Sequence, residues 1–172
     1  MKKRAMLLAV FVMICNVLVG CAPSGDEWKT DQVMGISYSA PAYWSTQEGT
    51  NYKSYNSADN SMLMITALEE PQQDLQSAYE TFTATIVNKT EVQSEETTVA
   101  GQTAQRYIFE HTEERNKLKS EMTFFQLDEK VYIVILTCPE KTFSQYGEIY
   151  DTIIESVTTS TQSALPPQEG QE

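Results

Sequence analysis

The alternation of apolar and polar positions predicts a chain of short strands with two amphipathic helices. Between residues 72 and 88 the apolar side chains recur at steps of four, three and four residues: Leu75, Tyr79, Phe82 and Ile86. This spacing puts them on one face of a helix, with Pro71 and Asp74 suited to its first turn. Residues 143–157 show the same helical spacing. Each predicted helix therefore has one apolar face to bury.

The other patterned segments alternate with period two or are apolar throughout, as strands do. They are residues 36–39, 52–55, 62–68, 91–99, 103–110, 118–127 and 131–138. The turn-rich residues 57–60 and the charged run 113–117 predict hairpins. Residues 131–136 are apolar at every position, which is typical of a strand buried on both faces, whereas the polar run 91–99 predicts an edge strand. The sheet therefore needs cover on both sides.

The N-terminal residues predict an export signal. Met1–Arg4 is basic, and Ala5–Gly20 contains Asn16 as its only polar residue. At about 1.5 Å per residue such a helix reaches only about 24 Å, less than the roughly 30 Å hydrocarbon core of a bilayer. A cleaved signal peptide over residues 1–20 is therefore favoured over a permanent membrane span.

The signal ends at Leu18-Val19-Gly20-Cys21, which resembles the lipobox of bacterial lipoproteins. The resemblance implies cleavage before Cys21 and attachment of lipid, palmitate included, to this residue. The protein would then be anchored at the extracytoplasmic face of a bacterial cell membrane. A generic signal cut elsewhere, with Cys21 a free thiol, is the alternative.

Composition fits one acidic domain. The chain has 172 residues, 41% of them hydrophobic, and its net charge is -12. Loss of residues 1–20 would leave 9 basic against 24 acidic side chains, a net charge of -15. This charge argues against nucleic acid as a partner, because phosphate binding needs a Lys/Arg surface. We expect a lipidated Cys21 with a flexible linker over residues 21–32, a domain over 33–157 and a disordered tail over 158–172.

Several short segments stand in a recognisable order along residues 33–157. They are Ile36-Ser37-Tyr38 before Pro41-Ala42-Tyr43-Trp44, then Gly101-Gln102-Thr103-Ala104, then Val131-Tyr132-Ile133-Val134 before Pro139, and last Phe143-Ser144-Gln145-Tyr146 before Ile153-Ile154-Glu155-Ser156-Val157. In this order they resemble the PsbP, Mog1 and DcrB-like family. The resemblance implies an α+β fold, an α/β/α sandwich around a central antiparallel sheet. It also implies a non-catalytic accessory or adaptor domain, with no shared catalytic residue or cofactor.

Few side chains offer catalytic chemistry. His111 is the only histidine, next to a charged turn, and an exposed hairpin position is expected for it. A metal site built from His111 and Glu113 is an alternative that matches no zinc spacing. Adjacent pairs such as Glu95-Glu96 point to opposite faces of a strand and do not converge. Cys138 ends an apolar run and is expected to be a small buried hydrophobe. We expect no catalytic residue, metal site or cofactor.

Aromatic residues gather in one short region, at Tyr43, Trp44, Tyr52 and Tyr55. Tyr and Trp join apolar area to a polar tip, as recognition surfaces require. One hypothesis is a binding surface made by Tyr43, Tyr52 and Tyr55 over a buried Trp44. The other is that Trp44 fills the core and the tyrosines cover it.

Together these patterns predict a membrane-anchored lipoprotein that binds a protein partner and is not an enzyme. Two alternatives stay open. One is a small-molecule carrier with a pocket between sheet and helix, and the other is a metal-dependent hydrolase that uses His111.

Overall fold

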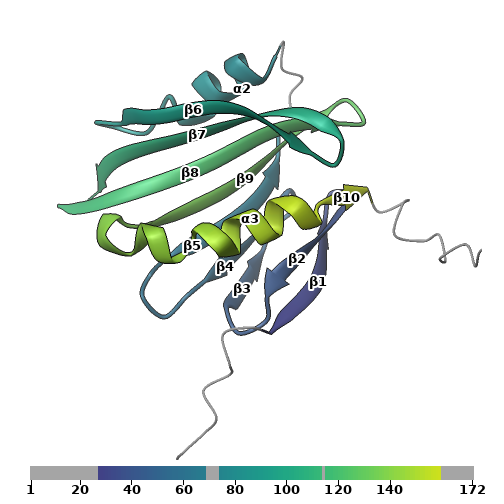
Figure 1. The fold of residues 1–172 in the computed structure, drawn as a ribbon, viewed down its shortest axis with the longest axis horizontal. Helices are drawn as coiled ribbons and strands as arrows, with labels where there is room; N and C mark the ends of the chain where they lie inside the picture. Colours follow the sequence, from purple (N-terminus) through teal and green to yellow (C-terminus); the bar gives the residue numbers. More distant parts are fainter. Residues whose placement is uncertain (1–26, 69–73, 114, 160–172) are drawn as a thin grey trace, which may run out of the picture.

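The computed structural model describes residues 27–68, 74–113 and 115–159, which form a mixed α+β fold (Figure 1). The elements are β1 (Trp28–Val33), β2 (Ile36–Pro41), β3 (Ser45–Glu48), β4 (Tyr52–Asn56), β5 (Met62–Ala67), α2 (Leu75–Thr83), β6 (Thr90–Val99), β7 (Gln102–Glu113), β8 (Asn116–Leu127), β9 (Lys130–Pro139), the 3-10 helix η1 (Glu140–Gln145), α3 (Gly147–Ser156) and β10 (Thr158–Thr159). In these ranges no helix has the length and apolar character needed to cross a bilayer.

Some expectations fall outside the described residues. They are the signal peptide over 1–20, the lipidated Cys21 with the first part of the linker, Pro71, and the tail from residue 160 onward. For these segments the sequence predictions stay predictions.

The main sheet has seven strands in the order β3-β4-β5-β9-β8-β7-β6, and every neighbouring pair is antiparallel. Strand β9 lies at its centre, and residues 131–136 are all buried. Strand β6, with its polar sequence, forms one edge. Both sequence predictions for these strands are confirmed.

Successive side chains of β9 point to opposite faces and enter two separate cores, as the pleat of a strand requires. Ile133 and Ile135 join a cluster that includes Ala78 and Tyr79 of α2. Val134 and Leu136 join a second cluster with the buried side of α3. The two helices therefore cover opposite faces of the sheet.

A second, three-stranded sheet in the order β1-β2-β10 shares the α3 face. Ile36 and Tyr38 of β2 are 1% exposed and belong to the same cluster as α3. One face of the main sheet is thus covered by α2 and the other by α3 together with a small sheet, which the sequence patterns did not predict.

The boundaries of the predicted linker and helices differ from those observed. Strand β1 begins at Trp28, inside the range 21–32 predicted as linker, and β10 follows residue 157. Of β1 only Val33 is fully buried, so this strand carries no hydrophobic pattern to detect. The predicted 72–88 helix ends at Thr83, and its start is fixed by a capping box in which Asp74 accepts from the Ser77 N–H at 2.7 Å. The predicted 143–157 helix begins as the 3-10 helix η1.

Candidate functional site

The aromatic region does not form one exposed surface. Tyr43 is 36% exposed and Tyr52 is half-buried, but Tyr55 is fully buried. Trp44 is buried as expected, with its ring 5.5 Å from that of Tyr146 in an edge-on contact. The expectation that Tyr55 contributes to a surface is therefore wrong. Its position on β4 faces the core, where its hydroxyl contacts the buried Tyr38 and the half-buried Asp31.

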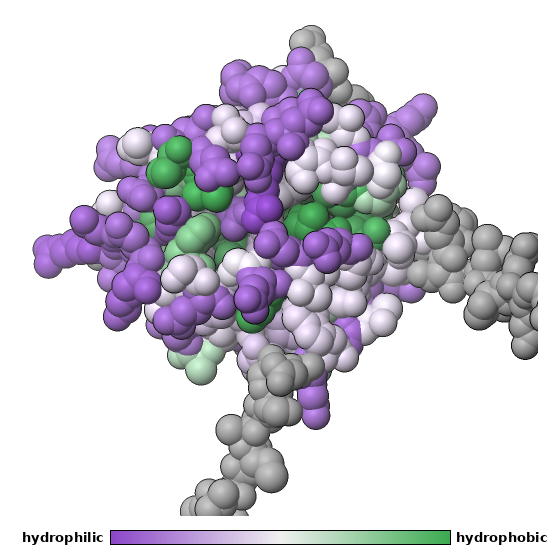
Figure 2. Space-filling model, viewed as in Figure 1, coloured by the Kyte–Doolittle hydropathy of each residue, from purple (hydrophilic) through white to green (hydrophobic). Residues whose placement is uncertain are grey.

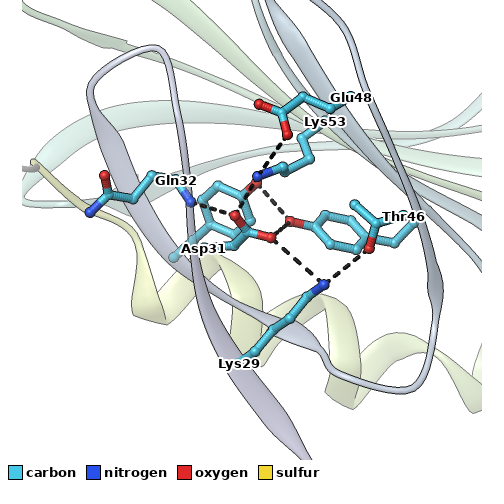
Figure 3. A network of polar contacts seen from close by, with 8 residues as sticks. Lys29, Asp31, Gln32, Thr46, Glu48 and Lys53 are labelled. Carbon is cyan, nitrogen blue, oxygen red and sulfur yellow. Dashed lines mark hydrogen bonds and ion pairs between the residues drawn. The ribbon is translucent and has the colours of Figure 1, made fainter.

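Those partners form the Asp31 network, shown in Figure 3, which we define as Asp31, Lys53, Tyr55 and Tyr38 with the flanking Lys29, Thr46 and Glu48. Lys53 donates to Asp31 Oδ1 at 2.5 Å, and the Tyr55 hydroxyl donates to Asp31 Oδ2 at 2.9 Å. The Tyr55 and Tyr38 hydroxyls are 2.9 Å apart. Asp31 and Tyr38 come from the small sheet, whereas Lys53 and Tyr55 come from β4, so the network joins the two sheets.

The hydrogen bonds donated to Asp31 together lower its pKa more than burial raises it. Burial alone would raise the pKa of Asp31, but hydrogen bonds from Lys53, the Gln32 N–H and Tyr55 lower it below its ordinary value. The pKa of Lys53 is raised, chiefly by its hydrogen bond to Asp31. Burial raises the pKa values of Tyr38 and Tyr55, so both phenols stay protonated. The groups satisfy one another and leave no ionised phenol to act as a base.

A second cluster, the Glu121 network, lies between the sheet and α3 and consists of Glu121, Arg106, Asp151 and Glu95. Arg106 pairs with the buried Glu121 and lies 2.9 Å from Asp151 Oδ1 and 3.9 Å from Glu95 Oε1. Burial raises the pKa of Glu121, although Arg106 acts to lower it. This network joins β6, β7, β8 and α3.

His111 is half-buried rather than exposed, which corrects the expectation for this residue. Its Nε2 lies 3.0 Å from Ser120 Oγ, which in turn lies 2.8 Å from Thr137 Oγ1. Burial lowers the pKa of His111, and nearby Glu113 partly opposes this. In the described residues no group of three or more His, Cys, Asp or Glu side chains is placed to hold a metal ion.

Cys138 is fully buried, as the sequence predicts, and its thiol lies 3.9 Å from the Lys119 carbonyl oxygen. Burial raises the pKa of the thiol to about 11. The protonated thiol is a poor nucleophile, because the thiolate is the reactive form.

A solvent-open hollow of about 640 Å³ lies where the β4–β5 turn, the β7–β8 hairpin and η1 meet. Arg115, Lys117 and Lys141 line it, and within the described ranges none of them lies in an ion pair. Two acidic residues also line it, Asp59 and Glu140. Sequence reasoning missed this hollow, because its cations come from the β7–β8 hairpin and from η1, which are far apart along the chain.

The carboxylate of Asp59 is already engaged by its own turn. It accepts hydrogen bonds from the Ser57 hydroxyl and, at 3.0 Å, from the Ser61 N–H. Burial acts to raise the pKa of Asp59, but these bonds lower it to about 2. Asp59 therefore keeps its negative charge, and in the hollow three cations face two acidic side chains without an ion pair among the described residues.

The face seen in Figure 2 is mostly hydrophilic, and its hydrophobic side chains emerge in separate patches divided by hydrophilic ones. This side of the molecule therefore presents no single continuous apolar surface of the kind that marks a large hydrophobic interface.

The arrangement of sheets and helices defines a PsbP-like fold. The chain is similar to the solution structure of cyanobacterial PsbP (CyanoP) from Synechocystis sp. PCC 6803, with a TM-score of 0.61 and 14% identity over 83% of this chain and 99% of that one. It is also similar to a crystal structure from Bacteroides thetaiotaomicron, with a TM-score of 0.56 and 11% identity over 84% of this chain and 52% of that one. No family model and no curated protein matches this chain in sequence.

A third similar structure is PA94 from Pseudomonas aeruginosa, a protein of unknown function, with a TM-score of 0.50 and 11% identity over 84% of this chain and 99% of that one. At these identities the likenesses show the fold alone, and function must be argued from the sites.

Proposed function

We propose that this chain is a lipid-anchored extracytoplasmic adaptor of the PsbP/Mog1/DcrB-like type, with a layered α/β/α arrangement, that binds a protein partner and performs no catalysis. One observation carries the proposal: the side chains with catalytic potential are held by internal partners, whereas the cations of the solvent-open hollow form no ion pair with any residue that the structure describes.

Internal pairing argues for binding over chemistry. Asp31 accepts from Lys53 and Tyr55, and Glu121 pairs with Arg106. A general base must reach a substrate proton, so a carboxylate surrounded by its own donors is poorly placed for that role. His111 is bonded to a serine and not to an orienting carboxylate.

The hollow suits an acidic segment of a partner protein. Lys29, Lys53, Arg106 and Lys119 all form ion pairs elsewhere in the described domain. The cations of the hollow stand apart from these, and the overall charge of -12 makes a local positive site distinctive. Complementary charge favours encounter and correct orientation of a partner.

The anchor is tested by labelling. Cells that express the wild type and are fed a labelled fatty acid should yield a labelled, membrane-bound protein. The Cys21→Ala variant should lose both the label and membrane retention. A labelled Cys21→Ala protein would show that lipid is attached elsewhere.

The adaptor role is tested by site-specific photo-crosslinking in native membranes. A photoreactive amino acid at Asn116, which lines the hollow, should capture a defined partner, and Lys117→Glu with Lys141→Glu should abolish the adduct. Lys130→Glu is the matched control, because Lys130 is an exposed lysine at the start of β9, outside the hollow. An adduct that still forms with Lys117→Glu and Lys141→Glu but is lost with Lys130→Glu would show that the partner binds outside the hollow.

A further inference from the structure

The end of the domain at which β1 begins carries two exposed aromatic side chains. Trp28 is 38% exposed and Tyr43 is 36% exposed. Among large hydrophobic residues in the described ranges, Val87 and Val92 are more exposed, at 70% and 52%, and they lie between α2 and β6 and on β6. Trp and Tyr, unlike Val, are the types enriched at membrane–water interfaces.

Backbone pairing brings the two aromatic residues to one end of the β1–β2 hairpin. Trp28 is opposite Pro41 in the register, and the Ala42 N–H donates to the Glu27 carbonyl at 2.9 Å. The tight turn at Met34 and Gly35 lies at the other end of the hairpin. Figure 1 shows β1 at one extremity of the molecule, where the described chain begins.

Tyr43 is supported from below. Its ring contacts the buried Trp44 edge-on, with centroids 6.4 Å apart. An exposed ring that packs on a fixed core residue loses little further conformational entropy when it contacts another surface.

Chain length limits how far this end can be from a lipid on Cys21. Six residue steps separate Cys21 from Glu27. At no more than about 3.6 Å per residue, they span at most about 22 Å in any conformation. A lipid anchor therefore holds the start of β1 close to the bilayer surface.

We propose that Trp28 and Tyr43 contact the headgroup region of the bilayer and orient the domain with the open end of the β1–β2 hairpin toward the membrane. This inference rests on the proposed lipid anchor. The attraction is short-ranged and not electrostatic, because the domain is strongly acidic and anionic lipid repels it. The contact therefore forms on zwitterionic lipid at least as well as on anionic lipid.

The chain contains an internal reporter, since Trp28 and Trp44 are its only tryptophans and Trp44 is buried. The experiment uses protein purified from host membranes, with lipidation read by intact mass, in phosphatidylcholine vesicles with or without brominated acyl chains. Emission should shift to shorter wavelength relative to the unlipidated Cys21→Ala protein and be quenched by bromine. Trp28→Phe should remove the quenched component, and Tyr43→Ser should weaken the quenching.

Matched variants separate contact from stability. Trp28→Phe and Tyr43→Ser should melt within about 2 °C of the wild type, because both positions are partly exposed. Val92→Ser changes an exposed apolar residue elsewhere and should leave the quenching unchanged. Lipidated protein without bromine quenching would overturn the contact and leave the proposed anchor intact. Protein without attached lipid would overturn both.

Discussion

The Asp31 network and the Glu121 network both pair a carboxylate with a cation, and both connect a covering layer to the main sheet. The pKa values of their carboxylates nevertheless differ from the ordinary value in opposite directions. Asp31 receives three hydrogen bonds, and its pKa is lowered. Glu121 is only 1% exposed, has Arg106 as its cationic partner, and its pKa is raised. The balance between donors and burial, rather than the presence of an ion pair, decides whether ionisation favours the fold.

The largest expected effect comes from breaking the buried pair. Arg106→Ala should lower the free energy of unfolding by about 3–5 kcal/mol at neutral pH, because it leaves Glu121 without a cation in a buried site. Denaturant unfolding measures this. A loss below about 1 kcal/mol would mean that Glu121 reaches water or takes up a proton at little cost, and the contrast with Asp31 would fail.

An apolar reference sharpens the comparison. Ile135 is 2% exposed on the α2 face of β9, with no charged network around it. Ile135→Ala should cost about 2–5 kcal/mol through lost burial and a residual cavity. Unlike the two networks, its effect should be equal at pH 4 and pH 7. A melting midpoint near that of the wild type would contradict burial of this strand on both faces.

The contrast also shows what the sequence could reveal. The apolar run of β9 predicted a central strand, and helical spacing predicted both helices, because burial leaves a pattern along the chain. The sequence patterns predict a linker where β1 lies, because β1 is held mainly by backbone pairing and by Asp31, and neither produces an apolar period.

The candidate sites were harder to predict for the same reason. A charged residue inside a mostly apolar strand, such as Glu121, indicates that a buried ion pair exists. Its pairing with Arg106 depends on the register between β7 and β8, which is set by the folded sheet and leaves no local pattern in the sequence. One of the two hypotheses puts Tyr55 on a surface because tyrosine joins apolar area to a polar tip, and a buried tyrosine has the same character. Its partner Asp31 lies 24 residues earlier in the chain, and no local pattern connects them.

The Asp31 network is tested by removing one charge. Asp31→Asn should lower stability at pH 7 by about 1.5–3 kcal/mol, because the strong bonds that Lys53 and Tyr55 donate to a charged acceptor weaken. Chemical unfolding of this variant beside Thr46→Ala, which removes only the exposed contact with Lys29, gives the matched control. Equal losses would mean that the buried part of the network adds nothing.

The pH dependence of the two networks should have opposite signs. The folded-state pKa of Asp31 is lowered, so its stabilisation is present above the ordinary carboxyl pKa and is lost as pH falls through the folded value. The folded-state pKa of Glu121 is raised, so its contribution is present below the ordinary value and is lost as pH rises through the folded one. In the wild type, the pH dependence of stability that comes from Asp31 and the one that comes from Glu121 therefore oppose each other across the acidic range.

The smallest expected effect isolates the Glu121 slope. Glu121→Gln should change stability at neutral pH by less than about 1 kcal/mol, because a neutral amide avoids the cost of burying a charge and its oxygen still accepts from Arg106. As pH falls, its free energy of unfolding should decrease more steeply than that of the wild type, because the loss at Asp31 is no longer offset by the opposite contribution of Glu121. Unfolding curves at half-unit steps between pH 3 and pH 8 measure both slopes. A profile for Glu121→Gln that superimposes on the wild type would show that Glu121 does not titrate with folding, and that its pairing with Arg106 fully compensates its burial.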